Sequence, residues 1–392
     1  MAVGMNAGPT VPEIQTAMIK VEAITLREIR MPLVHFFETS FGRTYHRRIL
    51  LVCLHCQGTE AWGECVAGEG PHYCEESIDT AWYVTREYLA PAVLGKTVDR
   101  GRDCAPLLAG IRGHRMAKAA VENALWHAES LQKGVALWRL LGGTRNQVAC
   151  GVSIGIQDSV EQLLEKIATE LKAGYQRIKV KIKPGWDVDV LEHIRARWPS
   201  ILLSCDANSA YTLDDVDHLL KLDAFNLLMV EQPLWNDDIY FHARLQKRIK
   251  TAICLDESIH NARDAQMAAE LGACRIMNIK VGRVGGFSEA IAVHDVCKAA
   301  GIPVWCGGML ESGIGRAHNL ALSSLENFTL PGDVSASKRY WKEDIIEPEV
   351  LVSPQGIVQL SDAPGTGRVI RKDLIQKLTV REETLSASSR KG

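Results

Sequence analysis

The sequence predicts an α/β protein in which a closed barrel of parallel strands follows a smaller α+β domain. Short apolar strands alternate with helical patterns from residue 148 onward, which is typical of a parallel sheet with helical crossovers. Seven such strands follow one another, and nothing between them would reverse their order, which favours a closed barrel over an open sheet. Charged residues recur at the strand ends with one spacing, as expected for repeated units around one mouth.

The first part of the chain, residues 18–145, is expected to form the α+β domain. Two strand-like runs, VEAITLREIRM and RRILLVCLHC, are joined by the aromatic, glycine-bearing loop HFFETSFGRTY. In AKAAVENALWHAESLQKGVALWRLLGG, apolar residues recur every three or four positions, and Gly142-Gly143 is expected to end the helix. Residues 1–17 lack a basic start and a long apolar stretch, so they are expected to be a loose leader rather than a signal peptide, with Met18 as an alternative start.

The barrel is assigned to residues 146–345. Its predicted strands are VACGVSI, RIKVKI, ILLSCDA, LLMVEQP, AICLDE, RIMNIK and PVWCGG. The predicted helices between them include SVEQLLEKIATELKAG, DVDVLEHIRAR, TLDDVDHLLKL and FSEAIAVHDVCKAAG. The alternation then fades, and the tail, residues 346–392, is expected to pack back on the first domain.

Composition excludes several classes of function. The 392 residues are 46% apolar and carry a formal net charge of −2, so no global field would attract nucleic acid or an anionic membrane. No apolar run approaches the roughly 20 residues that span a bilayer. Eleven scattered cysteines are typical of reduced thiols in a cytoplasmic protein. Cys53 and Cys56 lack a second pair at zinc spacing, so we expect two core thiols in a strand.

Five charged residues end successive predicted strands with a nearly constant spacing. The intervals between them are 25, 25, 25 and 24 residues, one β-α repeat each. Active sites of parallel barrels lie at the C-terminal ends of the strands, and unpaired buried charges are costly, so something is expected to bind among them. The five residues are Lys181, Asp206, Glu231, Asp256 and Lys280.

Asp206, Glu231 and Asp256 are three carboxylates on adjacent predicted strands. Hard oxygen ligands, with room left for water and substrate oxygens, suit Mg²⁺, or Mn²⁺ in its place. The alternative is that each carboxylate caps the helix that follows it. Because all three carboxylates occupy equivalent positions in successive repeats, a metal site is favoured over helix capping.

Lys179 and Lys181 lie two apart on one strand, so both point into the predicted barrel. Mutual repulsion and burial are expected to lower a lysine pKa toward the range useful for a general base. The alternative is an exposed edge strand or a small basic patch. Lys183 precedes Pro-Gly and is placed at the rim. Lys280, on the sixth strand, is expected to lie across the barrel from the second strand.

These groups together predict proton removal from the carbon beside a carboxylate. Such a proton is very weakly acidic, because its removal places a second negative charge on the carboxylate framework. Mg²⁺ on both carboxylate oxygens would stabilise the enediolate, and a lysine would take the proton. The expected substrate is a small-molecule carboxylate.

Several segments resemble the o-succinylbenzoate synthase and N-acylamino-acid racemase group of the enolase superfamily, in its muconate-lactonizing-enzyme subgroup. The similarity spans about residues 18 to 370 and rests on RIKVKIKPGWD, DANSAYTLDD, EQPL, LDESI, NIKVGRVGG, GGMLESGIGRAHN and FTLPGDVSASKRYW. It implies a modified TIM barrel, (β/α)7β, with an α+β N-terminal capping domain that the C-terminal tail completes. It also implies a homo-oligomer.

The resemblance implies roles for the charged residues. Lys181 would be a base, Lys179 its electrostatic partner, and Lys280 the opposing acid/base or a cation that stabilises the enediolate. The metal ligands would be Asp206, Glu231 and Asp256.

Other residues would shape the site. Asn208 would support the metal, Ser153 and the Gly308-Met309 turn would line the pocket, and the loop between His35 and Tyr45 would close over the substrate. Near Lys280, Arg283 matches an arginine of racemisation-competent members, and Val281 stands where the group commonly has proline.

Two reactions of this group share the predicted site. One is dehydration of a cyclohexadiene carboxylate to o-succinylbenzoate in menaquinone synthesis, which we favour because it is common in the family. The other is racemisation of N-acyl or N-succinyl amino acids, which needs a base on each face of the substrate. A muconate-type cycloisomerase and a dipeptide epimerase remain as alternatives, although Gly332-Asp333-Val334 supplies only one acid of the epimerase Asp-x-Asp pair. A non-catalytic scaffold is disfavoured because no ligand or base is missing.

Overall fold

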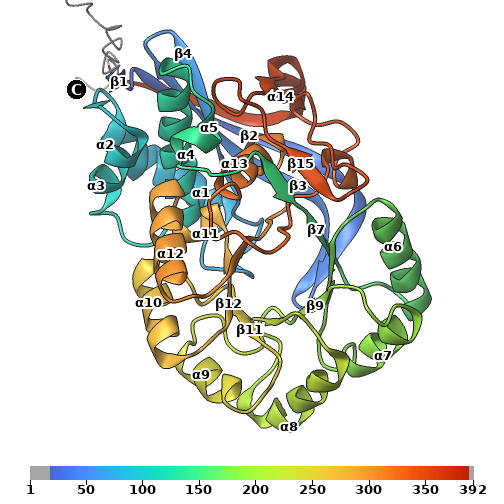
Figure 1. Cartoon of the computed structure of the whole chain (residues 1–392). Coiled ribbons are helices and arrows are strands. Elements are labelled where there is room, and N and C mark those ends of the chain that lie inside the picture. Colours follow the sequence, from blue (N-terminus) through green and yellow to red (C-terminus); the bar gives the residue numbers. More distant parts are fainter. Residues whose placement is uncertain (1–17, 388–392) are drawn as a thin grey trace, which may run out of the picture.

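The computed structural model describes residues 18–387, so the predicted leader, residues 1–17, lies outside the described residues. Its centre is a sheet of seven parallel strands in the order β13-β12-β11-β10-β9-β8-β7 (Figure 1). Each observed strand falls within one of the seven predicted segments, and the predicted α/β barrel is therefore confirmed. The strands are β7 (Gly151–Ile154), β8 (Arg177–Lys181), β9 (Leu203–Asp206), β10 (Val230–Glu231), β11 (Ile253–Leu255), β12 (Ile276–Ile279) and β13 (Val304–Cys306).

A short extended segment after the seventh strand closes the barrel. Parallel bridges join Phe328 to Val304 and Gly332 to Cys150. The N–H of Asp333 donates to the carbonyl of Cys306 at 2.8 Å, and the N–H of Gly151 donates to the carbonyl of Gly332 at 2.8 Å. This segment takes the eighth position, which agrees with the (β/α)7β arrangement.

Helices cover the outside of the barrel (Figure 1). In α6, for example, the Ser159 side chain accepts from the N–H of Gln162, and Leu163 and Ile167 form the buried face. The predicted helix TLDDVDHLLKL is interrupted, because 3₁₀ turns flank its short α-helix. The outer helices are α6 (Val160–Lys172), α7 (Val188–Arg197), α8 (Val216–Leu219), α9 (Tyr240–Gln246), α10 (Ala262–Leu271), α12 (Phe287–Ala299) and α13 (Gly313–Leu322).

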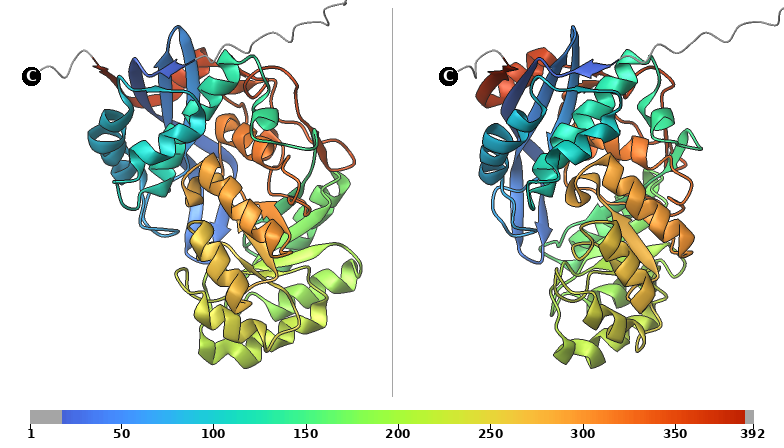
Figure 2. Two further views of the ribbon diagram at one scale, coloured as in Figure 1. Left: turned by 60° about the vertical axis from the view of Figure 1, so that its left-hand side comes forward. Right: turned by 90° about the vertical axis from the view of Figure 1, so that its left-hand side faces the viewer.

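The capping domain contains a four-stranded antiparallel sheet in the order β17-β2-β3-β4, with β2 (Ala23–Thr39), β3 (Gly42–Cys56), β4 (Thr59–Cys65) and β17 (Thr379–Ser386). The expected loop between His35 and Tyr45 is instead a β-hairpin, because β2 and β3 stay paired as far as Thr39 and Gly42. We call residues 35–45 the hairpin arm. Figure 2 shows the hairpin of β2 and β3 extending from the cap alongside the barrel.

One long helix, α4 (Arg115–Gln132), packs against this sheet. A Cβ at Gly63 on β4 would lie 1.9 Å from the carbonyl oxygen of Ala120, so glycine is required for this close approach. The prediction that the helix continues to Gly142 is wrong. Gly134 has a φ of +65°, which ends the helical path, and only a short helix, α5 (Leu137–Leu140), follows.

The tail returns to both parts of the molecule, whereas the sequence predicted contact only with the first domain. The short strand β15 (Ile357–Gln359) pairs with β6 (Gln147–Ala149) beside the barrel, and β17 pairs with β2 along Ala23–Ile29. The strand β14 (Ile346–Glu347) precedes β15, and β16 (Val369–Ile370) and α14 (Lys372–Leu378) lie between β15 and β17.

The strand thiols Cys53 and Cys56 are buried and free in β3, which confirms their prediction as core thiols. Cys53 belongs to the large core shared with the barrel, and Cys56 belongs to the core of the cap. Among residues 18–387, no helix is both long enough and apolar enough to cross a bilayer.

Candidate active site

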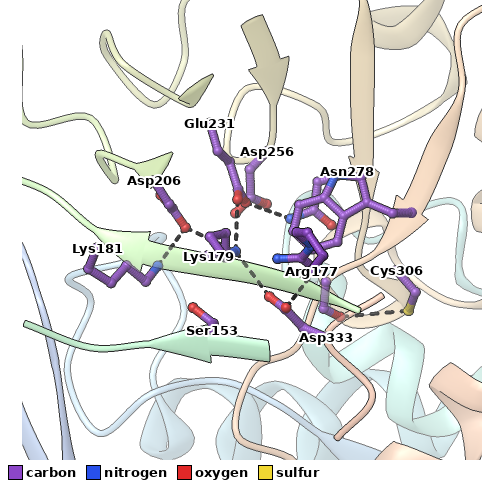
Figure 3. Close-up of polar contacts among 12 residues, drawn as sticks. Ser153, Arg177, Lys179, Lys181, Asp206, Glu231, Asp256, Asn278, Cys306 and Asp333 are labelled. Atoms are coloured by element: carbon purple, nitrogen blue, oxygen red, sulfur yellow. Dashed lines mark hydrogen bonds and ion pairs between the residues drawn. The ribbon is translucent and has the colours of Figure 1, made fainter. Parts of the chain in front are cut away.

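The five strand-end charges meet at one end of the barrel: Figure 3 shows Lys181, Asp206, Glu231 and Asp256, and Lys280 pairs with Asp256. Lys181, Asp206 and Glu231 are the last residues of β8, β9 and β10, while Asp256 and Lys280 directly follow β11 and β12. All five are buried, with at most 7% of any residue exposed. Because β8 and β12 are four positions apart in the sheet order, Lys181 and Lys280 lie on opposite sides of the mouth.

Asp206 holds the first lysine. Lys181 Nζ donates to Asp206 Oδ2 and to Asn208 Oδ1, at 2.6 Å each. The backbone N–H of Asn208 donates to Asp206 Oδ1 at 3.0 Å, and its side-chain amide donates to Glu257 Oε1 at 2.9 Å. Asn208 thereby links two carboxylates to the lysine.

Glu231 lies at the centre of the group. Lys179 Nζ donates to Glu231 Oε2 at 2.7 Å, and the Asn278 amide donates to Oε1 at 2.7 Å. Burial and the charge of Asp206 raise the pKa of Glu231 to about 8, although Lys179 opposes that rise. This carboxylate therefore has less positive charge around it than its ionised form requires.

Asp256 holds the second lysine. Lys280 Nζ donates to Asp256 Oδ2 at 2.7 Å, the Tyr73 hydroxyl donates to Oδ1 at 2.9 Å, and Arg283 also donates to Oδ1. Burial alone would raise the pKa of Asp256, but Lys280 and Arg283 outweigh it and lower that pKa. Tyr73 comes from the capping domain, and its hydroxyl lies 3.1 Å from Lys280 Nζ.

The expectation of a lowered lysine pKa is wrong for Lys179, and the pKa of Lys280, for which no lowering was predicted, is also raised. Burial would lower the pKa of Lys179, but Asp333, Glu231 and Asp206 raise it well above its ordinary value. Burial would likewise lower the pKa of Lys280, but Asp256 and the other anionic groups raise it. The sequence reasoning counted the neighbouring ammonium groups and missed the carboxylates that each lysine faces.

The carboxylates suit a divalent cation in chemical type, although their oxygens face lysines in this structure. Within residues 18–387, no three His, Cys, Asp or Glu side chains converge as metal ligands do. However, the ammonium of Lys179 lies 3.2 Å from Asp206 Oδ2 and 2.7 Å from Glu231 Oε2. A single cationic group therefore contacts both carboxylates. The raised pKa of Glu231 shows that more positive charge would be favourable there. Hard oxygen donors with this charge deficit fit Mg²⁺.

The hairpin arm reaches the mouth of the barrel. The Ser40 hydroxyl donates to the carbonyl of Asn208 at 3.2 Å, and the N–H of Ile156 donates to the carbonyl of Glu38 at 3.0 Å. Lys183 is 39% exposed by side chain and lies 3.5 Å from the Glu38 carboxylate, which confirms its placement at the rim. The cap thus contacts the barrel loops next to the site.

Of the predicted lining residues, Ser153 lies beside a lysine, and the Gly308-Met309 turn lies beside Asp333 and Glu311. Ser153, on β7, is the register partner of Lys179, and its buried hydroxyl has no hydrogen-bond partner among the described residues. A Cβ at Gly308 would lie 3.0 Å from the carbonyl oxygen of Asp333. The N–H of Met309 donates to Glu311 Oε1 at 2.8 Å, and its side chain packs against the core of the cap.

Sequence reasoning missed several residues that contact the charged group. Asp333 and Glu257 carry the strongest signal that was available, since one directly follows the closing segment and the other directly follows Asp256. The others give no such signal, because their contacts arise only when distant segments meet. The missed residues are Tyr73, Arg177, Glu257, Asn278 and Asp333.

The chain is similar to known proteins along most of its length. Residues 20–142 match the N-terminal domain of mandelate racemase and muconate lactonizing enzyme, and residues 162–374 match the family described as enolase C-terminal domain-like. An o-succinylbenzoate synthase from Geobacillus kaustophilus is 49% identical over 362 residues, which cover 92% of this chain and 96% of that protein. An N-succinylamino acid racemase from Amycolatopsis sp is also 49% identical over 362 residues, covering 92% and 98%.

Solved structures give the same assignment. A member of the enolase superfamily from Listeria innocua has a TM-score of 0.90 and 37% identity, and the match covers 94% of this chain and 99% of that chain. A dipeptide epimerase from Cytophaga hutchinsonii has a TM-score of 0.86 at only 24% identity, so this likeness concerns the fold alone. With relatives that are lyases or isomerases and with both domain families matched, this chain is an enzyme that belongs to the enolase superfamily.

Proposed function

We propose that this enzyme removes the proton α to the carboxylate of a small molecule and is an o-succinylbenzoate synthase. The observation that carries the proposal is the pair of buried lysines, Lys181 and Lys280, on opposite sides of three carboxylates. Relatives at 44–49% identity that bear the synthase name support the choice of dehydration.

Asp206, Glu231 and Asp256 would hold Mg²⁺, which supplies positive charge beside the substrate carboxylate when it is bound. Lys181, freed from Asp206, would take the α-proton on one face of the substrate. The ammonium of Lys280 on the other face would stabilise the enediolate, or would return a proton to it. Dehydration needs loss of the hydroxyl group after proton removal, and racemisation needs reprotonation from the second lysine.

Racemisation of N-succinylamino acids is the second candidate. One lysine on each side of the mouth meets the need for a base on each face, and the Amycolatopsis relative bears the racemase name. A dipeptide epimerase is disfavoured, because both carboxylate oxygens of Asp333 already face cationic side chains, Arg177 and Lys179.

Proton NMR in D₂O distinguishes these reactions. With Mg²⁺ and a panel of N-succinyl and N-acetyl L-amino acids, loss of the α-proton signal that EDTA prevents would support enediolate chemistry and racemase competence. A parallel assay with the cyclohexadiene carboxylate would detect formation of o-succinylbenzoate. Failure of both reactions, in protein shown to be folded, would contradict the proposed function.

A further inference from the structure

Lys179 lies among three carboxylates rather than two. Its Nζ is 2.7 Å from Glu231 Oε2, 3.2 Å from Asp206 Oδ2 and 3.0 Å from Asp333 Oδ2. Figure 3 shows the ammonium between the two strand-end carboxylates on one side and Asp333 on the other. Asp206 and Glu231 are proposed metal ligands, whereas Asp333 follows the segment that closes the barrel.

Asp333 is fixed on both its backbone and its side chain. Its N–H donates to the carbonyl of Cys306 within the barrel closure. Its Oδ1 accepts from Arg177 at 2.8 Å, and Arg177 is itself fully buried and donates to the carbonyl of Pro331 at 2.9 Å and 3.2 Å. Because Arg177 engages Oδ1, the second oxygen is left to face Lys179.

Trp305 fixes the direction of both cationic chains. Its ring lies 4.7 Å from the Arg177 guanidinium carbon and 4.6 Å from Lys179 Nζ. A cation over an aromatic face is attracted to it, most strongly when both are buried. The ring therefore stabilises Lys179 independently of its contacts with the strand-end carboxylates.

A bound metal ion would compete with the ammonium of Lys179 for the carboxylates of Asp206 and Glu231. A divalent cation on Asp206 and Glu231 would occupy the region that the ammonium of Lys179 now shares, and two cations in one buried place repel strongly. An ammonium without a carboxylate partner in the interior is costly. Lys179 therefore needs another anion within reach that is not itself a metal ligand.

We propose that Asp333 is the positioning residue that holds Lys179 when the metal occupies Asp206 and Glu231. The lysine keeps an ionic partner throughout, because a small rotation exchanges three carboxylate contacts for one contact and the Trp305 ring. Arg177 keeps Asp333 from turning toward the metal. The inference rests on the proposed function, since it presupposes the metal site.

The test measures metal affinity directly, by calorimetry with Mg²⁺ and by electron paramagnetic resonance with Mn²⁺. In Asp333→Asn, Lys179 should remain on Asp206 and Glu231 and compete with the ion, which should weaken binding on the order of tenfold. Asp333→Glu should restore part of the loss. An unchanged affinity in Asp333→Asn would overturn the inference.

A double-mutant cycle with Lys179→Met separates competition from the plain loss of a nearby negative charge. If Asp333 acts through the lysine, Asp333→Asn should have almost no effect on affinity in the Lys179→Met background. An equal loss in both backgrounds would contradict the inference.

Folding is controlled in two ways. If Asp333→Asn is poorly folded, the double variant Arg177→Gln/Asp333→Asn replaces it, because it leaves no unpaired buried guanidinium. This double variant should show the weakened metal binding that is expected of Asp333→Asn. Asp344→Asn changes another buried aspartate, which accepts from the N–H groups of Gly313 and Ile345, and it should bind metal as the wild type does. If the wild-type protein binds neither ion, the proposed function fails, which is a different result from unchanged binding in Asp333→Asn.

Discussion

The carboxylate of Glu64, on the edge strand β4 of the cap, accepts a hydrogen bond of 2.5 Å from the hydroxyl of Ser312, at the start of barrel helix α13. It also accepts from the N–H groups of Ser312 at 3.0 Å and Gly315 at 2.8 Å. An anion at a helix N-terminus is stabilised by the free N–H groups and by the helix dipole. This one side chain thus joins the cap to the helix that follows the Gly308-Met309 turn.

Glu64→Ala should loosen this junction. The variant leaves the N–H groups of Ser312 and Gly315 without their acceptor in a buried place, so the free energy of unfolding should fall by about 1–3 kcal/mol. Urea denaturation followed by circular dichroism measures the change. Glu60→Ala, which removes a more exposed carboxylate paired with Lys372, should cost much less. An equal loss of unfolding free energy in the two variants would show that the buried contact of Glu64 contributes no more than the exposed ion pair of Glu60.

Two buried histidines should make stability fall in acid. His127 on α4 and His318 on α13 lie with ring centres 5.9 Å apart. Burial lowers the pKa of His127 to about 4, and burial together with His127 lowers the pKa of His318 to about 3. Above about pH 6.5 both are neutral in the folded and unfolded chain; as the pH falls further, the unfolded chain takes up protons that the folded chain does not. Their contribution to stability is therefore present above about pH 6.5 and is lost toward pH 4.

The comparison of wild type with His318→Leu isolates this effect. Neither ring nitrogen of His318 has a hydrogen-bond partner among the described residues, so the substitution removes no polar contact. The variant should gain stability relative to the wild type by up to about 1.4 kcal/mol per pH unit as the pH falls from 6.5 to 4. Denaturant titrations at several pH values measure it, with exposed His72→Gln as the control. A constant difference between the two proteins across this range would refute the prediction.

Each lysine of the active site should serve one face of the substrate. If the enzyme is a racemase, Lys181→Ala should abolish α-proton exchange of one enantiomer and Lys280→Ala that of the other, with losses of about 10²-fold to 10⁴-fold. Exchange into D₂O from the separate L and D substrates measures this. Both variants should remain folded. Loss of exchange from both enantiomers in both variants would favour a single base with a stabilising cation, as the dehydration reaction requires, and an active Lys181→Ala protein would overturn its assignment as a base.

Removal of divalent cations should abolish turnover reversibly. EDTA followed by gel filtration should leave a folded but inactive protein, and added Mg²⁺ or Mn²⁺ should restore activity. Glu231→Gln should not be restored at ordinary concentrations, because it removes a central carboxylate of the proposed site. Full activity after exhaustive chelation, with no metal by elemental analysis, would exclude the proposed metal role.

The positions of the strand-end charges were predictable because one strand and one helix set a nearly constant repeat. Lys181, Asp206 and Glu231 therefore end neighbouring strands, as their spacing indicates. Their ion pairs were not predictable, since these depend on which side chains meet across the barrel. Lys179 was expected to be destabilised by Lys181, yet it lies among carboxylates, one of which is some 150 residues later in the chain at Asp333.

Secondary structure predicted from local sequence patterns is also wrong where contacts with distant segments determine the backbone conformation. The aromatic run around Phe37 has the composition of a loop with glycine, but contacts such as that between Glu38 and Ile156 hold it extended against the barrel. The helical pattern continues through Gly134, whose positive φ ends the helix because no side chain opposes that turn.

The pairing of β17 with β2 has a consequence for how the chain matures. Residues 379–386 complete a sheet that begins at residue 23, so this pairing has almost the greatest sequence separation the chain allows. Contacts of such separation form slowly, and during synthesis β2 has an open backbone edge until nearly the whole chain has left the ribosome. The barrel strands, by contrast, can assemble earlier. Newly made chains should therefore pass through a stage in which a formed barrel carries an unfinished cap, and this stage should be the one most in need of chaperones.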